Sequence, residues 1–147
     1  MPVFKSGKNL LNLLTTRNKP KLPPNSNPGV YRLTCSCGKH YVGETRLNIT
    51  TRVDQHHAST NNGNWARSAV ADHSKSCHGF FNWQSPENML KVTEGNFERK
   101  VREALEIQYH QCSPSDGGIN EDDGKYVSTK FWQPMFKFLR NRRKTTH

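Results

Sequence analysis

The chain has 147 residues, with 22 lysines and arginines against 12 acidic residues and a net charge of +10, and this length favours one hydrophobic core with flanking arms. Its mean hydropathy is −0.91, no apolar run reaches the roughly 18 residues of a membrane span, and no apolar signal segment follows a cationic one. These features exclude a membrane protein and favour a soluble protein that is not secreted.

The first predicted elements are an arm and a β-hairpin. Residues 6–17 carry leucines in a helical pattern, and the prolines within residues 19–28 cannot continue a helix, which predicts a linker. Residues 30–34 alternate between apolar and polar side chains, and residues 40–43 follow after a turn at Gly38. Two paired strands are therefore expected.

The middle of the chain is predicted to contain helices and one strand. Residues 48–59 and residues 65–75 both carry apolar side chains at helical spacing. Extended segments around a turn at Ser85-Pro86, and with them a third strand, are expected from the apolar side chains of Phe80, Phe81 and Trp83 and of Met89, Leu90 and Val92. Asn96 is expected to cap a helix over residues 97–109. The apolar stripe of this helix consists of Phe97, Val101, Ala104, Leu105 and Tyr109.

A loop and an aromatic segment complete the chain. Residues 112–124 predict a loop, and Cys112 at its start is expected to be a buried thiol. Aromatic and apolar side chains within residues 131–139 are expected to dock on the core. Together the elements favour the α+β class, with a small sheet of about three strands flanked by helices.

The net charge comes from the two ends of the chain. Residues 1–27 and residues 134–147 contain lysines and arginines but no acidic residue, whereas residues 28–133 contain 12 of each sign. Basic ends suit a polyanion such as DNA, because each neutralised phosphate releases counterions. The alternative is that they only keep the chain soluble. We therefore predict a basic arm over residues 1–27, a domain over residues 28–136 and a basic tail over residues 137–147.

Cysteine and histidine pairs indicate a metal site. Four cysteines in a chain that is expected to be intracellular favour thiols or a metal over disulfides. Cys35 and Cys37 lie in the hairpin, whereas His73 and His78 lie on either side of Cys77 near a helix end. Two pairs from two elements can build a tetrahedral zinc site that joins one turn to the other. The alternative is two strand-end thiols and two surface histidines.

Tyr31, Tyr41, Arg52 and His56 carry the side-chain types that a phosphodiesterase needs. At about 3.6 residues per turn, Arg52 and His56 lie one turn apart on the same helix face and can address the same phosphate. A phenol can move a proton and an imidazole can assist it. The alternatives are a solvated helix face for the pair and packing in the sheet for the tyrosines.

The order of these residues resembles that of the GIY-YIG nuclease superfamily over residues 28–136. The matching positions are Gly29-Val30-Tyr31, Tyr41-Val42-Gly43, Arg52, His56, Glu103 within Arg102-Glu103-Ala104-Leu105, and Asn120. Valine stands for isoleucine in both name motifs. The segments that are similar to the endonuclease domain of Penelope-like retroelements are residues 29–45, 71–73, 100–106 and 120–124. Residues 3–14 resemble the linker that joins reverse transcriptase to nuclease in those proteins.

The resemblance implies a GIY-YIG-like sheet with a zinc-stapled insertion and a role for each matched residue. Tyr31 takes a proton from the attacking water with the help of His56, and Arg52 neutralises the scissile phosphate. Tyr41 has an orienting role, Glu103 binds one Mg²⁺ or Mn²⁺ ion, and Asn120 supports the site. The residues that correspond to a CCHH zinc motif are Cys35, Cys37, His73 and His78. A guanidinium and a metal suit this chemistry, because cleavage builds negative charge on the non-bridging oxygens and the leaving 3′ oxygen.

Periodicity and resemblance disagree about Glu103. On a helical wheel it falls opposite the apolar stripe and one turn from Arg99, as in an exposed ion pair. A metal-binding carboxylate must instead face a water-filled site. We therefore favour Glu103 as the metal ligand, with Glu98 and Glu106 as alternatives.

We expect a metal-dependent DNA endonuclease in the nucleus that nicks its target and leaves a 3′ hydroxyl. A reverse transcriptase domain, normally in the same polypeptide, extends that primer. No membrane partner is expected, and engagement of RNA is left open. Two alternatives stand beside this function: a noncatalytic, zinc-stapled module that binds nucleic acid, and a nuclease selective for flaps or junctions.

Overall fold

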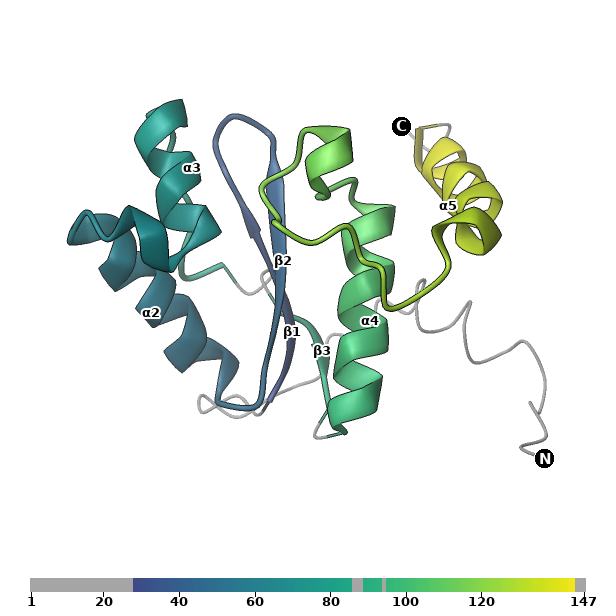
Figure 1. Cartoon of the computed structure of the whole chain (residues 1–147), viewed down its shortest axis with the longest axis horizontal. Helices are drawn as coiled ribbons and strands as arrows, with labels where there is room; N and C mark the ends of the chain where they lie inside the picture. Colours follow the sequence, from purple (N-terminus) through teal and green to yellow (C-terminus); the bar gives the residue numbers. More distant parts are fainter. Residues whose placement is uncertain (1–27, 86–88, 94, 145–147) are drawn as a thin grey trace.

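The computed structural model describes residues 28–85, 89–93 and 95–144. The predicted helix over residues 6–17, the linker and the basic arm lie outside the described residues. Within the described ranges, no helix is both long enough and apolar enough to cross a lipid bilayer. A three-stranded sheet between two groups of helices organises this part of the chain (Figure 1).

The sheet is antiparallel and has the strand order β2-β1-β3. β1 spans Gly29–Thr34, β2 spans His40–Thr45 and β3 spans Met89–Val92. Gly38 lies in the turn between β1 and β2 with a φ of 90°, a backbone conformation that residues with a Cβ atom rarely adopt. The predicted hairpin, its turn glycine and the third strand are confirmed.

Alternate residues of β1 point to opposite faces of the sheet. On one face, Tyr31 and Leu33 belong to a core cluster that includes Val53. This cluster joins the sheet to α2 (Ile49–Asn61) and α3 (Ala69–Cys77), which form the helical layer on the left in Figure 1. The first face of the sheet is therefore buried by the helices that follow the hairpin.

The second face of the sheet packs against α4 (Asn96–Tyr109). Val30 and Val42 from the sheet form a cluster with Ile107 and Cys112, and all four side chains are buried. The prediction that Cys112 is a buried thiol is confirmed, and burial raises the pKa of this thiol to about 12. Cys112 therefore contributes to packing as a neutral side chain.

The helix predicted over residues 65–75 is interrupted. A 3₁₀ turn, η1 (Trp65–Arg67), precedes α3, and Ser68 between them is extended, with φ −156° and ψ 123°. The Ser68 hydroxyl accepts a hydrogen bond from the Ala71 amide at 3.4 Å, as expected of an N-cap. The prediction of a continuous helix is wrong, because Ser68 leaves the helical conformation to cap α3.

The fourth helix begins earlier than predicted. Gly95 is the N-cap of α4 and Asn96 is already helical, so the predicted capping role of Asn96 is wrong. After α4, the predicted loop contains one 3₁₀ turn, η3 (Pro114–Asp116).

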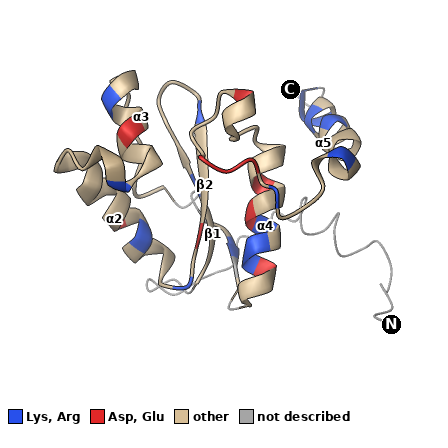
Figure 2. Ribbon diagram, in the orientation of Figure 1, with Lys and Arg blue, Asp and Glu red and all other residues tan. Residues whose placement is uncertain are grey.

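The C-terminal helix α5 spans Thr129–Lys144 and packs on α4 through Phe136 and Leu139. The predicted boundary between domain and tail, after residue 136, therefore falls inside a helix whose later residue Leu139 is buried. The last turn carries Arg142, Arg143 and Lys144, so the basic tail continues a helix that is docked on the domain (Figure 2).

Candidate active site

A cavity of about 290 Å³ is lined by residues from β2, α2, η1, the start of α3, α4 and the loop after η3. Five of the six residues that were predicted to be catalytic line it: Tyr41, Arg52, His56, Glu103 and Asn120. The sixth, Tyr31, is hydrogen-bonded to His56 beneath the cavity lining. The predicted residues therefore converge, although their catalytic roles stay predictions.

Tyr31 and His56 form a buried polar pair on the first face of the sheet. The Tyr31 hydroxyl lies 2.7 Å from His56 Nε2, and the two side chains are 1% and 3% exposed. Burial raises the pKa of Tyr31 well above its ordinary value, with the neighbouring Tyr41 as a second cause. Burial and the charge of Arg52 lower the pKa of His56 to about 4. At neutral pH the pair is therefore a phenol beside a neutral imidazole.

Gly43 leaves room for the ring of Tyr31. A Cβ atom at position 43 would lie 2.5 Å from the Tyr31 hydroxyl oxygen and 2.6 Å from Cζ of the ring. Because β1 and β2 pair residue 31 with residue 43, the phenol lies across the glycine on the neighbouring strand. Gly43 of the second name motif is therefore required because the ring of Tyr31, from the first name motif, occupies the space that a Cβ atom would take.

We expect Gly43→Ala to lower the free energy of unfolding by about 1–3 kcal/mol, as measured by urea denaturation, because Tyr31 has to move. In a Tyr31→Ala background the same substitution should cost much less, because the clash is gone. Equal costs in both backgrounds would show that the strain does not come from Tyr31.

The cavity has one cationic side and one acidic side. Arg52 on α2 and the exposed Arg67 on η1 line it together with Glu103, Glu121 and Asp122. Figure 2 shows blue segments on α2, both red and blue segments on α4, and red segments in the loop that passes in front of α4. Sequence reasoning missed Arg67, because an arginine in a polar turn gives no signal before the fold places it. Such an arrangement can hold a phosphate between guanidinium groups and a carboxylate-bound metal.

Glu103 has the environment of a cation ligand. Burial is the largest cause that raises its pKa, and the charges of Glu44 and Asp122 raise it further, to about 7. A divalent cation would relieve this repulsion between carboxylates, and carboxylate oxygens are the ligands that Mg²⁺ and Mn²⁺ prefer. The side chains present therefore fit the predicted metal at Glu103, with Asp122 as a neighbouring oxygen donor.

Arg99, which the helical wheel places in an exposed ion pair, is buried. Its Nε donates to a carboxylate oxygen of Glu44 on β2 at 2.9 Å. Glu98, one alternative to Glu103, accepts a hydrogen bond from the hydroxyl of Thr93. Neither Arg99 nor Glu98 lines the cavity. Glu103 is therefore the residue of α4 that contributes a carboxylate to the cavity lining.

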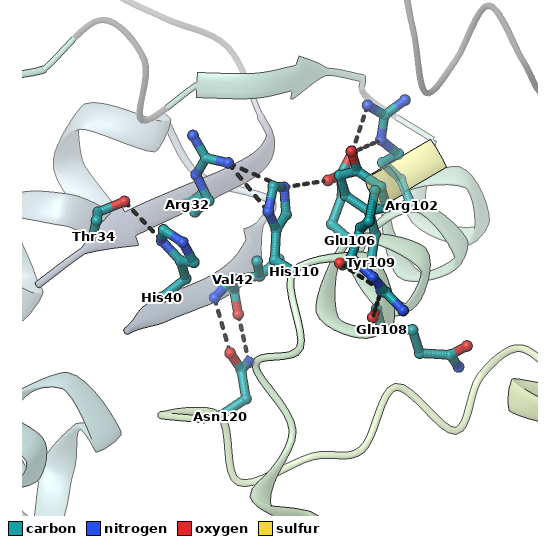
Figure 3. Close-up of polar contacts among 11 residues, drawn as sticks. Arg32, Thr34, His40, Val42, Arg102, Glu106, Gln108, Tyr109, His110 and Asn120 are labelled. Atoms are coloured by element: carbon teal, nitrogen blue, oxygen red, sulfur yellow. Dashed lines mark hydrogen bonds and ion pairs between the residues drawn. The ribbon is translucent and has the colours of Figure 1, made fainter. Parts of the chain in front are cut away.

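Glu106, the other alternative, belongs to a separate buried network on the second face of the sheet (Figure 3). Its carboxylate accepts from Arg102 at 2.6 Å and lies 3.1 Å from His110 Nε2, while an Arg32 nitrogen lies 3.1 Å from the same ring nitrogen. These partners hold the pKa of Glu106 below its ordinary value despite burial. The carboxylate of Glu106 therefore forms ion pairs inside the protein.

Asn120 supports the edge of the sheet next to the cavity. Its side-chain oxygen accepts a hydrogen bond from the Val42 amide at 2.9 Å, and its side-chain nitrogen donates to the Val42 carbonyl at 2.6 Å (Figure 3). The amide thus satisfies both outward backbone groups of one residue on an edge strand. It fixes β2 beside Tyr41, in line with the supporting role that the resemblance implies.

A second group of possible metal ligands ties the hairpin to α3. Cys35, Cys37, His73 and Cys77 each offer an atom, and these atoms all lie within 4.8 Å of one another. Cys35 Sγ is 4.0 Å from Cys77 Sγ, and Cys37 Sγ is 3.4 Å from His73 Nε2. Tetrahedral zinc with usual bond lengths separates sulfur atoms by about 3.8 Å and sulfur from nitrogen by about 3.6 Å. The four side chains fit a zinc ion.

The fourth member of this cluster is Cys77, whereas the sequence predicted His78 as the fourth ligand. His78 is the exposed C-cap of α3, in the left-handed conformation with φ 52°, and it lies outside the cluster. Residues four apart share a helix face, whereas residues five apart do not. The spacing of His73 and Cys77 was therefore the signal in the sequence that favoured the cysteine.

Comparison with known proteins identifies a family for this chain. Residues 27–115 match the family model described as the GIY-YIG catalytic domain. This span includes the hairpin, α2, the cysteine and histidine cluster and Glu103, whereas Asn120 and α5 lie beyond it. No curated protein and no solved structure matches the chain.

Proposed function

Because the chain belongs to the family of GIY-YIG catalytic domains, which are nucleases, we propose that it is a metal-dependent endonuclease that nicks one strand of DNA. The observation that carries this proposal is the position of Glu103. A carboxylate from α4 lines the same cavity as Arg52 and His56 from α2, although the two helices lie on opposite faces of the sheet. A module that only binds nucleic acid has no need for this convergence.

The side chains suggest how cleavage proceeds. Arg52 would neutralise the non-bridging oxygens of the scissile phosphate, and Tyr41 would orient it. The attacking water gives its proton to Tyr31, whose own proton passes to His56 Nε2 along the 2.7 Å hydrogen bond. Mg²⁺ or Mn²⁺ at Glu103 would supply charge stabilisation at the leaving 3′ oxygen. The oxygen of the attacking water bonds to phosphorus as the bond between phosphorus and the 3′ oxygen breaks. The 3′ oxygen takes up a proton from solvent water, which leaves a 3′ hydroxyl and a 5′ phosphate.

We further propose that the nick primes reverse transcription. The similarity of residues 29–45 and 100–106 to the endonuclease domain of Penelope-like retroelements supports this proposal. A reverse transcriptase domain, normally in the same polypeptide, would extend the 3′ hydroxyl, and chromosomal DNA as the target implies action in the nucleus. RNA would then be a second nucleic acid near the protein.

Nicking of a supercoiled plasmid tests the proposal. We expect relaxed circles in Mg²⁺ or Mn²⁺ and 3′ ends that a DNA polymerase extends without further treatment. Tight DNA binding without nicking in either metal would instead support the noncatalytic module. Faster cleavage of flaps or four-way junctions than of linear duplex would support the structure-selective nuclease.

Arg67 is expected to contact a phosphate next to the scissile one. We predict that Arg67→Ala weakens plasmid binding about three- to tenfold and reduces the slope of log affinity against log salt by about 0.9, because one phosphate contact is lost. Filter binding over a range of salt concentrations measures both quantities. Lys75, exposed on α3 and outside the cavity lining, provides the matched control, and an equal effect of Lys75→Ala would show only a general charge effect.

A further inference from the structure

The hydrogen bond between Tyr31 and His56 continues to a third side chain. His56 Nδ1 lies 2.7 Å from the hydroxyl oxygen of Ser68, and His56 Nε2 lies 2.7 Å from the hydroxyl of Tyr31. All three side chains are buried. Both ring nitrogens of His56 are therefore engaged by protein groups.

One tautomer of His56 allows Nε2 to accept a proton from Tyr31. Burial raises the pKa of Tyr31, so the phenol is protonated at neutral pH and its O–H can donate to Nε2. A neutral imidazole carries one N–H, which must then be on Nδ1 and donate to Ser68. Ser68 can accept this bond together with the longer one from the Ala71 amide, because a hydroxyl oxygen has two lone pairs.

We propose that Ser68 is a positioning residue that holds His56 as the Nδ1–H tautomer, with Nε2 directed at Tyr31 and ready to receive its proton. This inference rests on the proposed nuclease function. In the step that Ser68 supports, a water O–H bond breaks as Tyr31 gains that proton, and the Tyr31 O–H bond breaks as Nε2–H forms. The resulting imidazolium keeps its Nδ1–H bond to Ser68, which becomes a stronger, charge-assisted bond.

The backbone explains why a serine reaches His56 from α3. Ser68 is extended at the break between η1 and α3, and its hydroxyl both caps the helix and meets the imidazole. Further along α3, His73 and Cys77 belong to the cluster that joins this helix to the hairpin. The hairpin strand β1 carries Tyr31 itself. The helix that presents Ser68 is thus tied to the strand that presents the phenol.

Kinetics of three variants test the role of Ser68. Ser68→Gly removes the hydroxyl but keeps a residue that helix N-termini tolerate. We expect kcat for plasmid nicking to fall about ten- to a hundredfold with KM unchanged, because a base that loses its orienting partner is less effective. Ser68→Thr keeps the hydroxyl and should restore kcat to within about threefold. Ser74→Ala removes a comparable hydroxyl from the same helix, which bonds to the Val70 carbonyl, and should leave kcat unchanged.

The tautomer itself can be observed by ¹⁵N NMR of the histidine side chains, with the His56 signals assigned by their loss in His56→Gln. We expect Nδ1–H in the native protein and a shift toward Nε2–H in Ser68→Gly. An unchanged tautomer, an unchanged kcat in Ser68→Gly, or no rescue by Ser68→Thr would overturn the role of Ser68. If the native protein nicks no DNA, the nuclease function fails, and the NMR result alone then decides whether Ser68 sets the tautomer.

Discussion

Glu103→Gln is expected to lower the rate of Mg²⁺-dependent plasmid nicking by at least about a thousandfold while DNA binding is retained. The amide has the shape of the carboxylate but lacks the charge that would hold a divalent cation. The matched control is Glu98→Gln on the same helix, since Glu98 lies outside the cavity lining and bonds to Thr93. Nicking at the native rate by Glu103→Gln, or an equal loss in Glu98→Gln, would remove Glu103 from the site.

The same variant should not be destabilised, which separates lost chemistry from lost folding. The pKa of Glu103 is raised from 4.5 to about 7, so the folded protein binds the proton more tightly than the unfolded chain does. Without added Mg²⁺ or Mn²⁺, the free energy of unfolding of the native protein therefore falls as the pH rises from about 4.5 to about 7. Glu103→Gln lacks this group and should be at least as stable as the native protein at pH 8, as measured by urea denaturation.

The hairpin was predictable because its signals are local. Residues of β1 alternate between two buried faces, and the turn needs a glycine at position 38. The interruption at Ser68 was not predictable in the same way. Its extended backbone is stabilised by a bond to His56, twelve residues earlier in the chain, and no helical pattern contains that information.

The helical wheel places Glu103 on an exposed face, which is misleading because α4 is buried on more than one side. Leu105 and Tyr109 pack toward α5, whereas Ile107 packs on the sheet. Glu103 lies one turn before Ile107 and therefore shares its sheet-facing side, next to β2. Phe97, which the sequence assigns to the apolar stripe, is 68% exposed. A wheel that assumes one buried face cannot represent a helix between a sheet and another helix.

The cysteine and histidine cluster was only partly predictable. Two ligands from the hairpin and His73 on α3 followed from residue type and chain order, and the structure brings them together. The fourth position depended on which residue shares a helix face with His73. The pairing of two histidines and the CCHH motif that the resemblance implies favoured His78, whereas helix geometry favours Cys77.

Cys77→Ser is therefore expected to reduce zinc from about one ion per chain to well below that level and to weaken zinc affinity at least about a hundredfold. His78→Ala should retain the ion, because His78 lies outside the cluster. Elemental analysis measures the zinc content, and competition with a coloured chelator measures the affinity. Loss of zinc in His78→Ala with retention in Cys77→Ser would contradict the fourth ligand that the geometry selects.

Loss of zinc should also lower the melting temperature and the nicking rate together. The cluster joins the turn after β1, the strand that carries Tyr31, to α3, which begins after Ser68. Without the ion these two segments lose their shared anchor. Cys112→Ala controls for loss of a thiol as such, since Cys112 is buried on the other face of the sheet. This variant should keep its zinc while losing about 1–2 kcal/mol of stability to a small cavity. A melting temperature for Cys77→Ser equal to that of the native protein would mean that zinc does not hold α3 to the hairpin.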